Sequence, residues 1–190
     1  MPASTLTKVF FPTRLGDFRM SGHREEGQEI LVLEYGKLAE PVLVRMHSKC
    51  LTGDVFGSLR CDCRSQLEES IEMIKKNGNG ILIYMDQEGR GIGLVNKIRT
   101  YELQDEGYDT MEANQKLGFA ADSRTYGAAA KILHELSVKK IRLITNNPKK
   151  VEGLESHGIK VVERVPIIIN PSRYNARYLK TKKDRMGHLL

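Results

Sequence analysis

The chain has 190 residues, 40% of them hydrophobic, with a formal net charge of +6 at pH 7 and a pI near 9.2. This length suits one domain with its own hydrophobic core. Apolar runs stay well short of the roughly 18 residues of a membrane span, and the first residues lack a signal-peptide pattern, so we expect a cytoplasmic protein with no membrane contact. The positive charge favours an anionic partner: a nucleic acid, a membrane surface or a phosphorylated small molecule.

The first half of the chain alternates β and α signals. Residues 1–40 are expected to form a small antiparallel β region. Two apolar runs, 30–35 and 41–46, flank a Gly-Lys turn, which predicts a strand pair joined by a short loop. Apolar residues then recur at helical spacing over 66–76, and an Asn-Gly turn leads into a buried strand over 81–85.

The second half repeats this alternation. A glycine-rich turn opens a second helix, whose apolar face we expect to carry Leu94, Ile98 and Tyr101. A third helix is expected near 125–136, with Tyr126, Ala129, Ala130 and Leu133 facing the core. The remaining elements are a strand over 141–145, a helix from Pro148, a strand over 160–164 and a basic helical segment over 173–187.

This order of elements predicts one α/β domain over 1–190. Its sheet would be mixed and mostly parallel, flanked by helices over 41–190 and preceded by the smaller antiparallel β region. In such sheets ligands collect at the carboxyl ends of the strands. Three polar loops follow predicted strands here, and we expect them to converge: the cysteine-containing loop, residues 87–93 and residues 145–150.

The chain contains three cysteines, Cys50, Cys61 and Cys63. A closed structural zinc site has four protein ligands, whereas a catalytic zinc keeps one tetrahedral position for water, whose pKa falls to about 7. Three thiolates therefore favour a catalytic zinc. The alternatives are buried thiols without a metal, or a disulfide and a spare thiol. His47, three residues before Cys50, would close the site if it were a fourth ligand.

The other polar loops have plain and functional interpretations. Residues 87–93 place backbone amides and an arginine at a helix N-terminus, which suits phosphate, but a flexible turn explains the glycines equally well. Residues 145–150 could bind phosphate or a base edge, or merely cap a helix. Asp122 and Arg124 could be a helix cap and a surface arginine, and Tyr101 a core tyrosine. The remaining histidines, His23, His134, His157 and His188, suggest no second site.

Six ordered blocks of the sequence resemble the GTP cyclohydrolase II family. The resemblance runs from about residue 40 to the C-terminal end and is looser before that. Its blocks are residues 43–54 with 58–63, 87–94, 103–110 with 112–114, 143–150, 162–166 and 186–190.

The resemblance implies an enzyme of riboflavin biosynthesis. It would hydrolyse GTP to 2,5-diamino-6-ribosylamino-4(3H)-pyrimidinone 5′-phosphate, formate and pyrophosphate, the first committed step. It also implies zinc on Cys50, Cys61 and Cys63, magnesium with the triphosphate, and a homodimer. We expect no nucleic-acid partner, and no fused dihydroxybutanone phosphate synthase domain.

Residue roles follow from the same resemblance. Arg124 would be the nucleophile at the α-phosphorus, Asp122 a proton acceptor, and Tyr101 would assist ring opening. An arginine nucleophile is chemically demanding, because a guanidinium is protonated at ordinary pH. The residues implied to contact GTP are Arg45, Met46, His47, Ser48, Lys49, Gln66, Glu88, Gly89, Arg90, Thr110, Thr145 and Lys150.

The chain departs from the family pattern at a few positions. Lys49 stands where the family commonly has Glu, Met46 replaces a usual Val, Arg64 a usual Gly, and Asp86 is an uncommon acid. These departures leave open a paralogue that opens the guanine ring but yields a formamidopyrimidine or other product. A structural-zinc nucleic-acid-binding protein is the alternative from another class, and it requires a closed four-ligand site and salt-dependent affinity.

Overall fold

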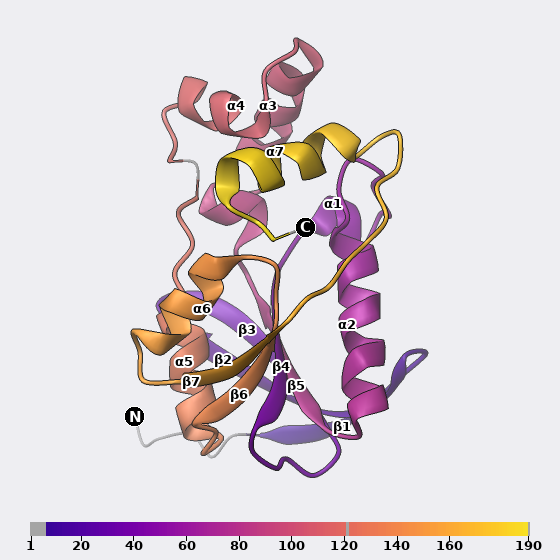
Figure 1. The fold of residues 1–190 in the computed structure, drawn as a ribbon, viewed down its shortest axis with the longest axis vertical. Coiled ribbons are helices and arrows are strands. Elements are labelled where there is room, and N and C mark those ends of the chain that lie inside the picture. The colour runs from indigo at the N-terminus through magenta and orange to yellow at the C-terminus, as the bar shows by residue number, and fades with distance from the viewer. Residues whose placement is uncertain (1–6, 121, 190) are drawn as a thin grey trace.

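A seven-stranded sheet with helices on both faces forms the body of the protein (Figure 1). The structure is a computed structural model that describes residues 7–120 and 122–189; residues 1–6 of the predicted N-terminal β region lie outside this part. The strands are β1 (Lys8–Thr13), β2 (Gly16–Glu25), β3 (Gln28–Tyr35), β4 (Val42–Ser48), β5 (Gly80–Met85), β6 (Lys140–Ile144) and β7 (Lys160–Val165).

The strand order is β1-β2-β3-β5-β4-β6-β7. Strands β1, β2, β3 and β5 pair antiparallel, whereas β5, β4, β6 and β7 pair in parallel. The predicted mixed α/β architecture is therefore confirmed, with the antiparallel strands continuous with the parallel part. Burial explains how apolar residues are distributed in these strands. Both faces of β4 and β5 are covered, so their sequences are nearly unbroken apolar runs, whereas buried and exposed residues alternate along β2.

The predicted pairing of 30–35 with 41–46 is wrong, because β5 lies between β3 and β4. The loop between them, residues 36–41, is long enough to step over one strand, a distance of about 10 Å. Two apolar runs joined by a short loop can form a hairpin, or they can form two strands with a third strand between them, and the sequence does not distinguish these cases. The nearly complete burial of β5 requires a partner on each edge, and β3 and β4 provide them.

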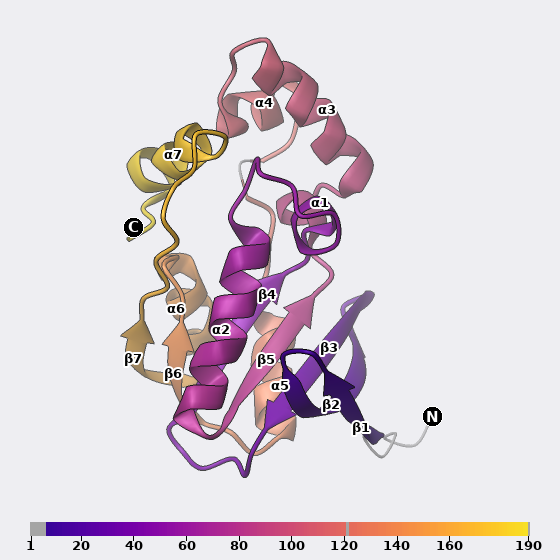
Figure 2. The same ribbon diagram turned by 90° about the vertical axis from the view of Figure 1, so that its right-hand side faces the viewer.

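Helices cover both faces of the sheet. Figures 1 and 2 show α2 on one face, α5 and α6 on the other, and α3, α4 and α7 beyond the ends of the strands. The helical elements are α1 (Leu51–Asp54), α2 (Cys63–Asn77), the 3-10 turn η1 (Glu88–Gly91), α3 (Leu94–Asp105), α4 (Thr110–Lys116), α5 (Gly127–Glu135), α6 (Pro148–Glu155) and α7 (Ala176–Met186). Among the described residues, no helix combines the length and apolarity that crossing a membrane requires.

Two hydrophobic clusters hold these layers together. The cluster under α2 contains Ile71 and Ile74 against Leu43, Leu82 and Ile144 of the sheet. The cluster under α5 contains the four residues predicted to face the core, which are all buried: Tyr126, Ala129, Ala130 and Leu133. The helical spacing therefore gave the correct face for α2 and α5.

The predicted face of α3 is wrong. Ile98 is 49% exposed, whereas the polar residues Lys97 and Thr100 are buried. The reason is that α3 packs against the polar loops at the strand ends, not against the sheet. Helix α4 was not predicted, although the capping box of Asp109 and Glu112 marks its N-terminus.

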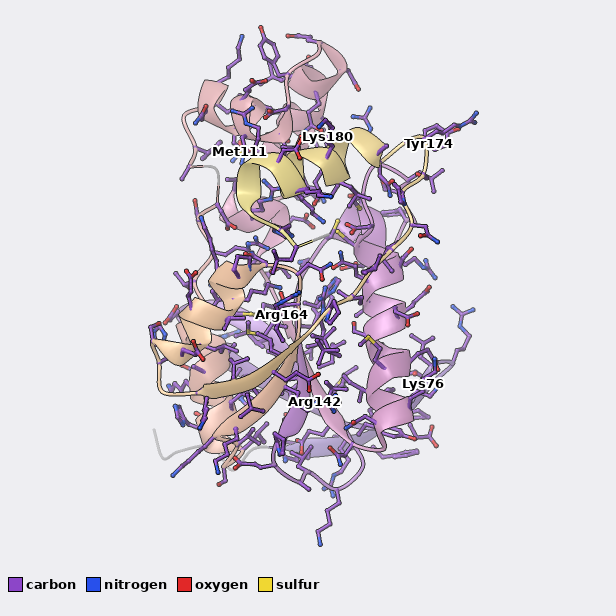
Figure 3. The ribbon with its side chains drawn as sticks, in the orientation of Figure 1. Lys76, Met111, Arg142, Arg164, Tyr174 and Lys180 are labelled. Carbon is purple, nitrogen blue, oxygen red and sulfur yellow. The ribbon has the colours of Figure 1, made fainter. Side chains whose placement is uncertain are left out.

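One end of the molecule therefore gathers the functional loops. Strands β4, β5 and β6 end at Ser48, Met85 and Ile144, next to one another in the sheet. In the stick view, Met111 of α4 and Lys180 of α7 lie at this end, while Lys76 lies near the far end of α2 (Figure 3). The expected convergence of loops places the site beneath α3, α4 and α7.

Candidate active site and metal centre

The three cysteines form one cluster. Cys50 precedes α1, and Cys61 and Cys63 lie at the start of α2. The Sγ atoms of Cys50 and Cys61 are 3.8 Å apart, and all three sulfurs lie within 4.8 Å of one another. Tetrahedral zinc with bonds of about 2.3 Å to sulfur requires sulfurs about 3.8 Å apart, so the donor set fits this ion.

Gly53 makes room for the cluster. A Cβ atom at this position would lie 2.8 Å from the Sγ of Cys61 and 3.1 Å from the Sγ of Cys50. Only glycine leaves the three sulfurs where they are. The short helix α1 therefore acts as one wall of a metal cage.

His47 does not belong to the cluster, which contains only the three cysteines among the described residues. Its Nε2 lies 3.1 Å from Oδ1 of Asp54, and its ring stacks on Tyr84. Burial is the main cause that lowers the pKa of His47. Asp54 also accepts from the backbone N–H of Cys50 at 2.9 Å, so His47 supports the metal loop from beneath.

A buried ion pair fixes the same loop from the other side. Glu88 accepts hydrogen bonds from Lys97 at 2.7 Å and from the backbone N–H of Leu51 at 2.6 Å. The ammonium of Lys97 also donates to the Sγ of Cys50 at 3.1 Å and to the hydroxyl of Thr52 at 2.9 Å. Hydrogen bonds from the other two cysteines, and then Lys97, lower the pKa of Cys50, which favours the metal-binding thiolate.

Tyr101 lies beside this pair and is not a core residue. Its hydroxyl is 3.3 Å from the hydroxyl of Thr52, and the guanidinium of Arg60 lies over its ring at 5.0 Å. Burial raises the pKa of Tyr101 above its ordinary value. The phenol is therefore protonated at neutral pH and can donate a proton toward the metal cage.

Three cations of the site have no carboxylate partner among the described residues; we call Arg45, Arg90 and Lys150 the unpartnered cations. Arg45 donates to the side chain of Gln66 at 2.7 Å and to a carbonyl at 3.2 Å, but its Nε has no partner. Nη1 of Arg90 is likewise unsatisfied, and Lys150 donates to the Met46 carbonyl at 2.7 Å.

Burial lowers the pKa of two of these cations, Arg45 and Lys150. It lowers the pKa of Arg45 to about 10, and burial followed by the charges of Arg45 and Arg124 lowers that of Lys150 well below its usual value. Buried cations without a counter-ion are costly, so they indicate a place for an anion.

Unlike the unpartnered cations, Arg124 has a carboxylate partner: Asp122 accepts two hydrogen bonds from its guanidinium. Nε lies 2.8 Å from Oδ1 and Nη2 lies 2.6 Å from Oδ2. Burial would lower the pKa of Arg124, but Asp122 outweighs it and raises that pKa. Tyr126 occupies the N-cap position of α5, so Asp122 is not the cap of this helix.

A single pocket collects nearly all the predicted site residues. Met46 and Asp122 are absent from its lining: the side chain of Met46 lies in the core, and Asp122 reaches the pocket through Arg124. The predicted residues that line it are Arg45, His47, Ser48, Lys49, Cys50, Cys61, Cys63, Gln66, Glu88, Gly89, Arg90, Tyr101, Thr110, Arg124, Thr145 and Lys150.

Other lining residues were missed from the sequence: Arg60, Lys97, Tyr178, Lys182 and His188. Lys97 precedes Tyr101 by one helical turn, a spacing that could have identified it. His188 was regarded as isolated. No local pattern connects the last three to the site, because only tertiary folding brings α7 over the pocket.

The fold and the pocket define a class: an α/β protein in which a cluster of three cysteines that could hold a metal ion lies in the same pocket as cations without a carboxylate partner among the described residues. A family model described as GTP cyclohydrolase II matches residues 4–166. The chain therefore belongs to the GTP cyclohydrolase II family.

Curated relatives of two lengths resemble the chain. GTP cyclohydrolase-2 from Buchnera aphidicola subsp. Schizaphis graminum is 55% identical, over 97% of this chain and 96% of its own. Riboflavin biosynthesis protein RibBA is 56% identical in Aquifex aeolicus and 54% in Chlorobium phaeovibrioides. The chain spans about half the length of these RibBA proteins, 47% and 45% respectively.

Among solved structures, a two-domain 3,4-dihydroxy-2-butanone 4-phosphate synthase, RibBX from A. baumannii, matches with a TM-score of 0.42 and 18% identity. The match covers 88% of this chain and 42% of that one.

Proposed function

We propose that this chain is a zinc-dependent GTP cyclohydrolase II. It would hydrolyse GTP to 2,5-diamino-6-ribosylamino-4(3H)-pyrimidinone 5′-phosphate, formate and pyrophosphate in riboflavin biosynthesis. One observation carries the proposal: the same pocket contains a three-thiolate cage and the three unpartnered cations. A nucleoside triphosphate supplies both the ring to be hydrolysed and the anion that these cations lack.

Cys50, Cys61 and Cys63 would hold the zinc ion. When bound there, zinc supplies a Lewis acid with an open position for water and so the means to hydrolyse the imidazole ring. The donor set supports this, since the described residues offer three sulfurs and no fourth ligand. A closed structural site, as in the nucleic-acid-binding alternative, would require that fourth ligand.

Tyr101 would supply the proton for ring opening. Its raised pKa keeps the phenol protonated, and its contact with Thr52 holds the hydroxyl next to the metal loop. Lys97 contacts both Thr52 and Cys50, so the tyrosine and one metal ligand are positioned by the same side chain.

The unpartnered cations would bind the triphosphate. Arginine and lysine form charge-assisted hydrogen bonds with phosphate oxygens, and Thr145 lines the same part of the pocket. The magnesium ion would arrive with the triphosphate itself: Glu88, the one carboxylate that lines the pocket among the described residues, is already bound to Lys97 and two backbone N–H groups.

The Asp122–Arg124 pair would act at the α-phosphorus. For Arg124 to be the nucleophile, Asp122 must take its proton, and the two side chains are within hydrogen-bond distance for that transfer. The ion pair opposes it, because it stabilises the protonated guanidinium. The nucleophilic role therefore stays a prediction that mutation can test.

The ion pair between Lys49 and Asp86 supports the deformylated pyrimidinone as the product. The ammonium of Lys49 lies 3.1 Å from the carboxylate of Asp86, so two departures from the family pattern compensate each other at the rim of the pocket. We also propose that residues 1–190 work as one domain in a cytoplasmic homodimer, by analogy with the family.

Mass spectrometry of the reaction with GTP tests the proposal. The zinc-loaded protein is incubated with GTP and magnesium while formate and pyrophosphate are assayed in parallel. Loss of one carbon as formate, together with pyrophosphate, is the expected result. A formyl-retaining product would indicate the paralogue, and unchanged GTP would overturn the proposed activity.

A further inference from the structure

Helix α7 and the residues after it form a wall of the pocket, through Tyr178, Lys182 and His188. The family-model match ends at residue 166, before this segment begins. Figures 1 and 2 show α7 beyond the ends of the strands. Three contacts connect this wall to the site.

The first contact is a buried ion pair. The ammonium of Lys182 lies 2.8 Å from Oδ1 of Asp62, and their side chains are only 10% and 2% exposed. Asp62 stands between two cysteines of the metal cage, Cys61 and Cys63. Lys182 therefore neutralises a carboxylate that is otherwise buried beside the cage.

Through Gln66, Asp62 is also connected by hydrogen bonds to Arg45, one of the unpartnered cations. Its other oxygen, Oδ2, accepts from Nε2 of Gln66 at 2.5 Å, and Oε1 of Gln66 accepts from Arg45 at 2.7 Å. Lys182, Asp62, Gln66 and Arg45 thus form one chain of hydrogen bonds. In it the amide of Gln66 separates the guanidinium of Arg45 from the carboxylate.

The other two contacts come from the ends of the same wall. The centroid of the Tyr178 ring lies 4.4 Å from the ammonium of Lys182 and 6.0 Å from the guanidinium of Arg90. The backbone N–H of Leu189 donates to the carbonyl of Asn146 at 2.9 Å, within the polar loop of residues 145–150. The wall is thus connected to Arg45 and Arg90, and to the loop of residues 145–150 that carries Lys150.

We propose that α7 is a working part of the site and that Lys182 is a positioning residue for Arg45. By binding Asp62, Lys182 prevents this carboxylate from pairing with Arg45 and so leaves the guanidinium free for the polyphosphate of the substrate. This inference rests on the proposed function, which assigns the pocket to a triphosphate.

Removing Lys182 has a specific consequence. Asp62 would lose its cation in a buried place, and Asp62 already exerts the largest attractive charge effect on Arg45. Arg45 is then the cation available to pair with it, and a paired arginine binds phosphate less tightly. The expected loss is about one charge-assisted hydrogen bond, roughly a ten- to hundredfold weaker affinity for polyphosphate.

Calorimetric titration of the full-length, zinc-loaded protein with inorganic triphosphate in excess magnesium tests this chain. Lys182→Met is compared with Lys183→Met, which removes the same charge from the neighbouring, exposed position of α7. The second comparison is the double variant Asp62→Asn/Lys182→Met, in which the introduced amide oxygen still accepts from Gln66 but no longer attracts Arg45. Circular dichroism checks that each variant is folded.

We expect Lys182→Met to bind triphosphate at least about tenfold more weakly than Lys183→Met, and the double variant to recover to within about threefold of the wild type. Equal affinity of the two single variants would overturn the proposal. A double variant as weak as Lys182→Met would also overturn it, since Lys182 would then act without Asp62. If Lys182→Met does not fold, the affinity of the double variant is the deciding result: affinity within about threefold of the wild type supports the proposal, and a weaker affinity overturns it.

Turnover of GTP by the wild type separates this inference from the proposed function. A wild type that binds triphosphate without converting GTP would refute the activity but leave the positioning role standing. A wild type that converts GTP while Lys182→Met binds like its control would refute the positioning role alone. A wild type that does not bind triphosphate would overturn the inference.

Discussion

The region around the cysteines and the region at the ends of β4, β5 and β6 differ in how their charged side chains are paired. Near the cysteines, Lys97 and Lys182 each have a carboxylate within 2.8 Å, Glu88 and Asp62 respectively. Near the strand ends, the unpartnered cations have none among the described residues. In the first region the buried lysines are paired with carboxylates of the protein, whereas in the second the cations have no such carboxylate among the described residues.

This difference separates positioning from binding. A buried ion pair holds side chains in place, and losing either partner leaves an uncompensated charge. A buried cation without a partner lowers the stability of the free protein and is retained where a ligand completes it. From this difference we infer that the paired cations position the site and that the unpartnered cations would bind an anionic substrate.

The largest expected effect comes from opening the metal cage. Cys61→Ser removes one of three sulfurs, so bound zinc should be lost and ring opening should be abolished with it. Metal analysis and formate release measure the two effects. An active variant without zinc would show that the cage is not the reaction centre.

Substitutions of Arg124 test whether a cation that is paired with a carboxylate also takes part in pyrophosphate release. Arg124→Ala should reduce pyrophosphate release by about a hundredfold or more, because the α-phosphorus loses its neighbouring cation. Arg124→Lys keeps the charge and should recover part of the rate if the role is electrostatic, whereas a covalent guanylyl adduct on Arg124, sought by mass spectrometry of the acid-quenched wild type, is expected only if this residue is the nucleophile. Pyrophosphate assays under single-turnover conditions measure both variants, and near-normal release from Arg124→Ala would remove this residue from the reaction.

The comparison predicts opposite stability effects for two lysines. Lys150→Met removes a buried unpartnered charge, so the free energy of unfolding should rise by about 1 kcal/mol while triphosphate affinity falls about tenfold or more. Lys97→Met leaves Glu88 without its cation and should lower the free energy of unfolding by about 3 kcal/mol. Urea unfolding of both variants measures the difference. Destabilisation by both would contradict the distinction.

The lowered pKa of Lys150 also predicts a pH dependence. Between this lowered value and the ordinary 10.5, the unfolded chain binds the proton that the folded protein gives up. Stability in that window should therefore rise with pH, by at most about 1.4 kcal/mol per pH unit for one group. Unfolding at a series of alkaline pH values should show a steeper rise for the wild type than for Lys150→Met. Parallel curves would refute the assignment.

The smallest effect is expected at the rim. Lys49 and Asp86 are 36% and 47% exposed, and exposed pairs contribute little. Exchanging the two charges, Lys49→Asp with Asp86→Lys, should change stability by less than about 0.5 kcal/mol and leave the product unaltered. Thermal unfolding and product mass check this, and a changed product would show that Lys49 reads the base.

Much of the site was predictable because local patterns determine it. Cysteine spacing and the polar loops after buried strands indicated the right end of the sheet, and helical spacing gave the buried faces of α2 and α5. The insertion of β5 between β3 and β4 was not predictable, since strand order depends on pairings distant in sequence.

The wrong face of α3 has a physical cause. This helix packs on polar loops, so its buried residues are Lys97 and Thr100, and hydrophobic spacing does not identify them. Lys97 and Lys182 are buried because Glu88 and Asp62 meet them, and those partners are identified only once the chain is folded. Pairing between charges has no sequence period comparable to that of apolar packing.

Gly53 restricts the mutations that the metal loop can accept. Added there, one methyl group would stand 2.8 Å from the Sγ of Cys61, closer than such carbon atoms approach sulfur in folded proteins. Metal–sulfur bonds tolerate errors of only about 0.2 Å. Alanine at position 53 would thus disable the metal cage while leaving every ligand in the sequence. A descendant of this chain could retain all three cysteines and still have lost its chemistry.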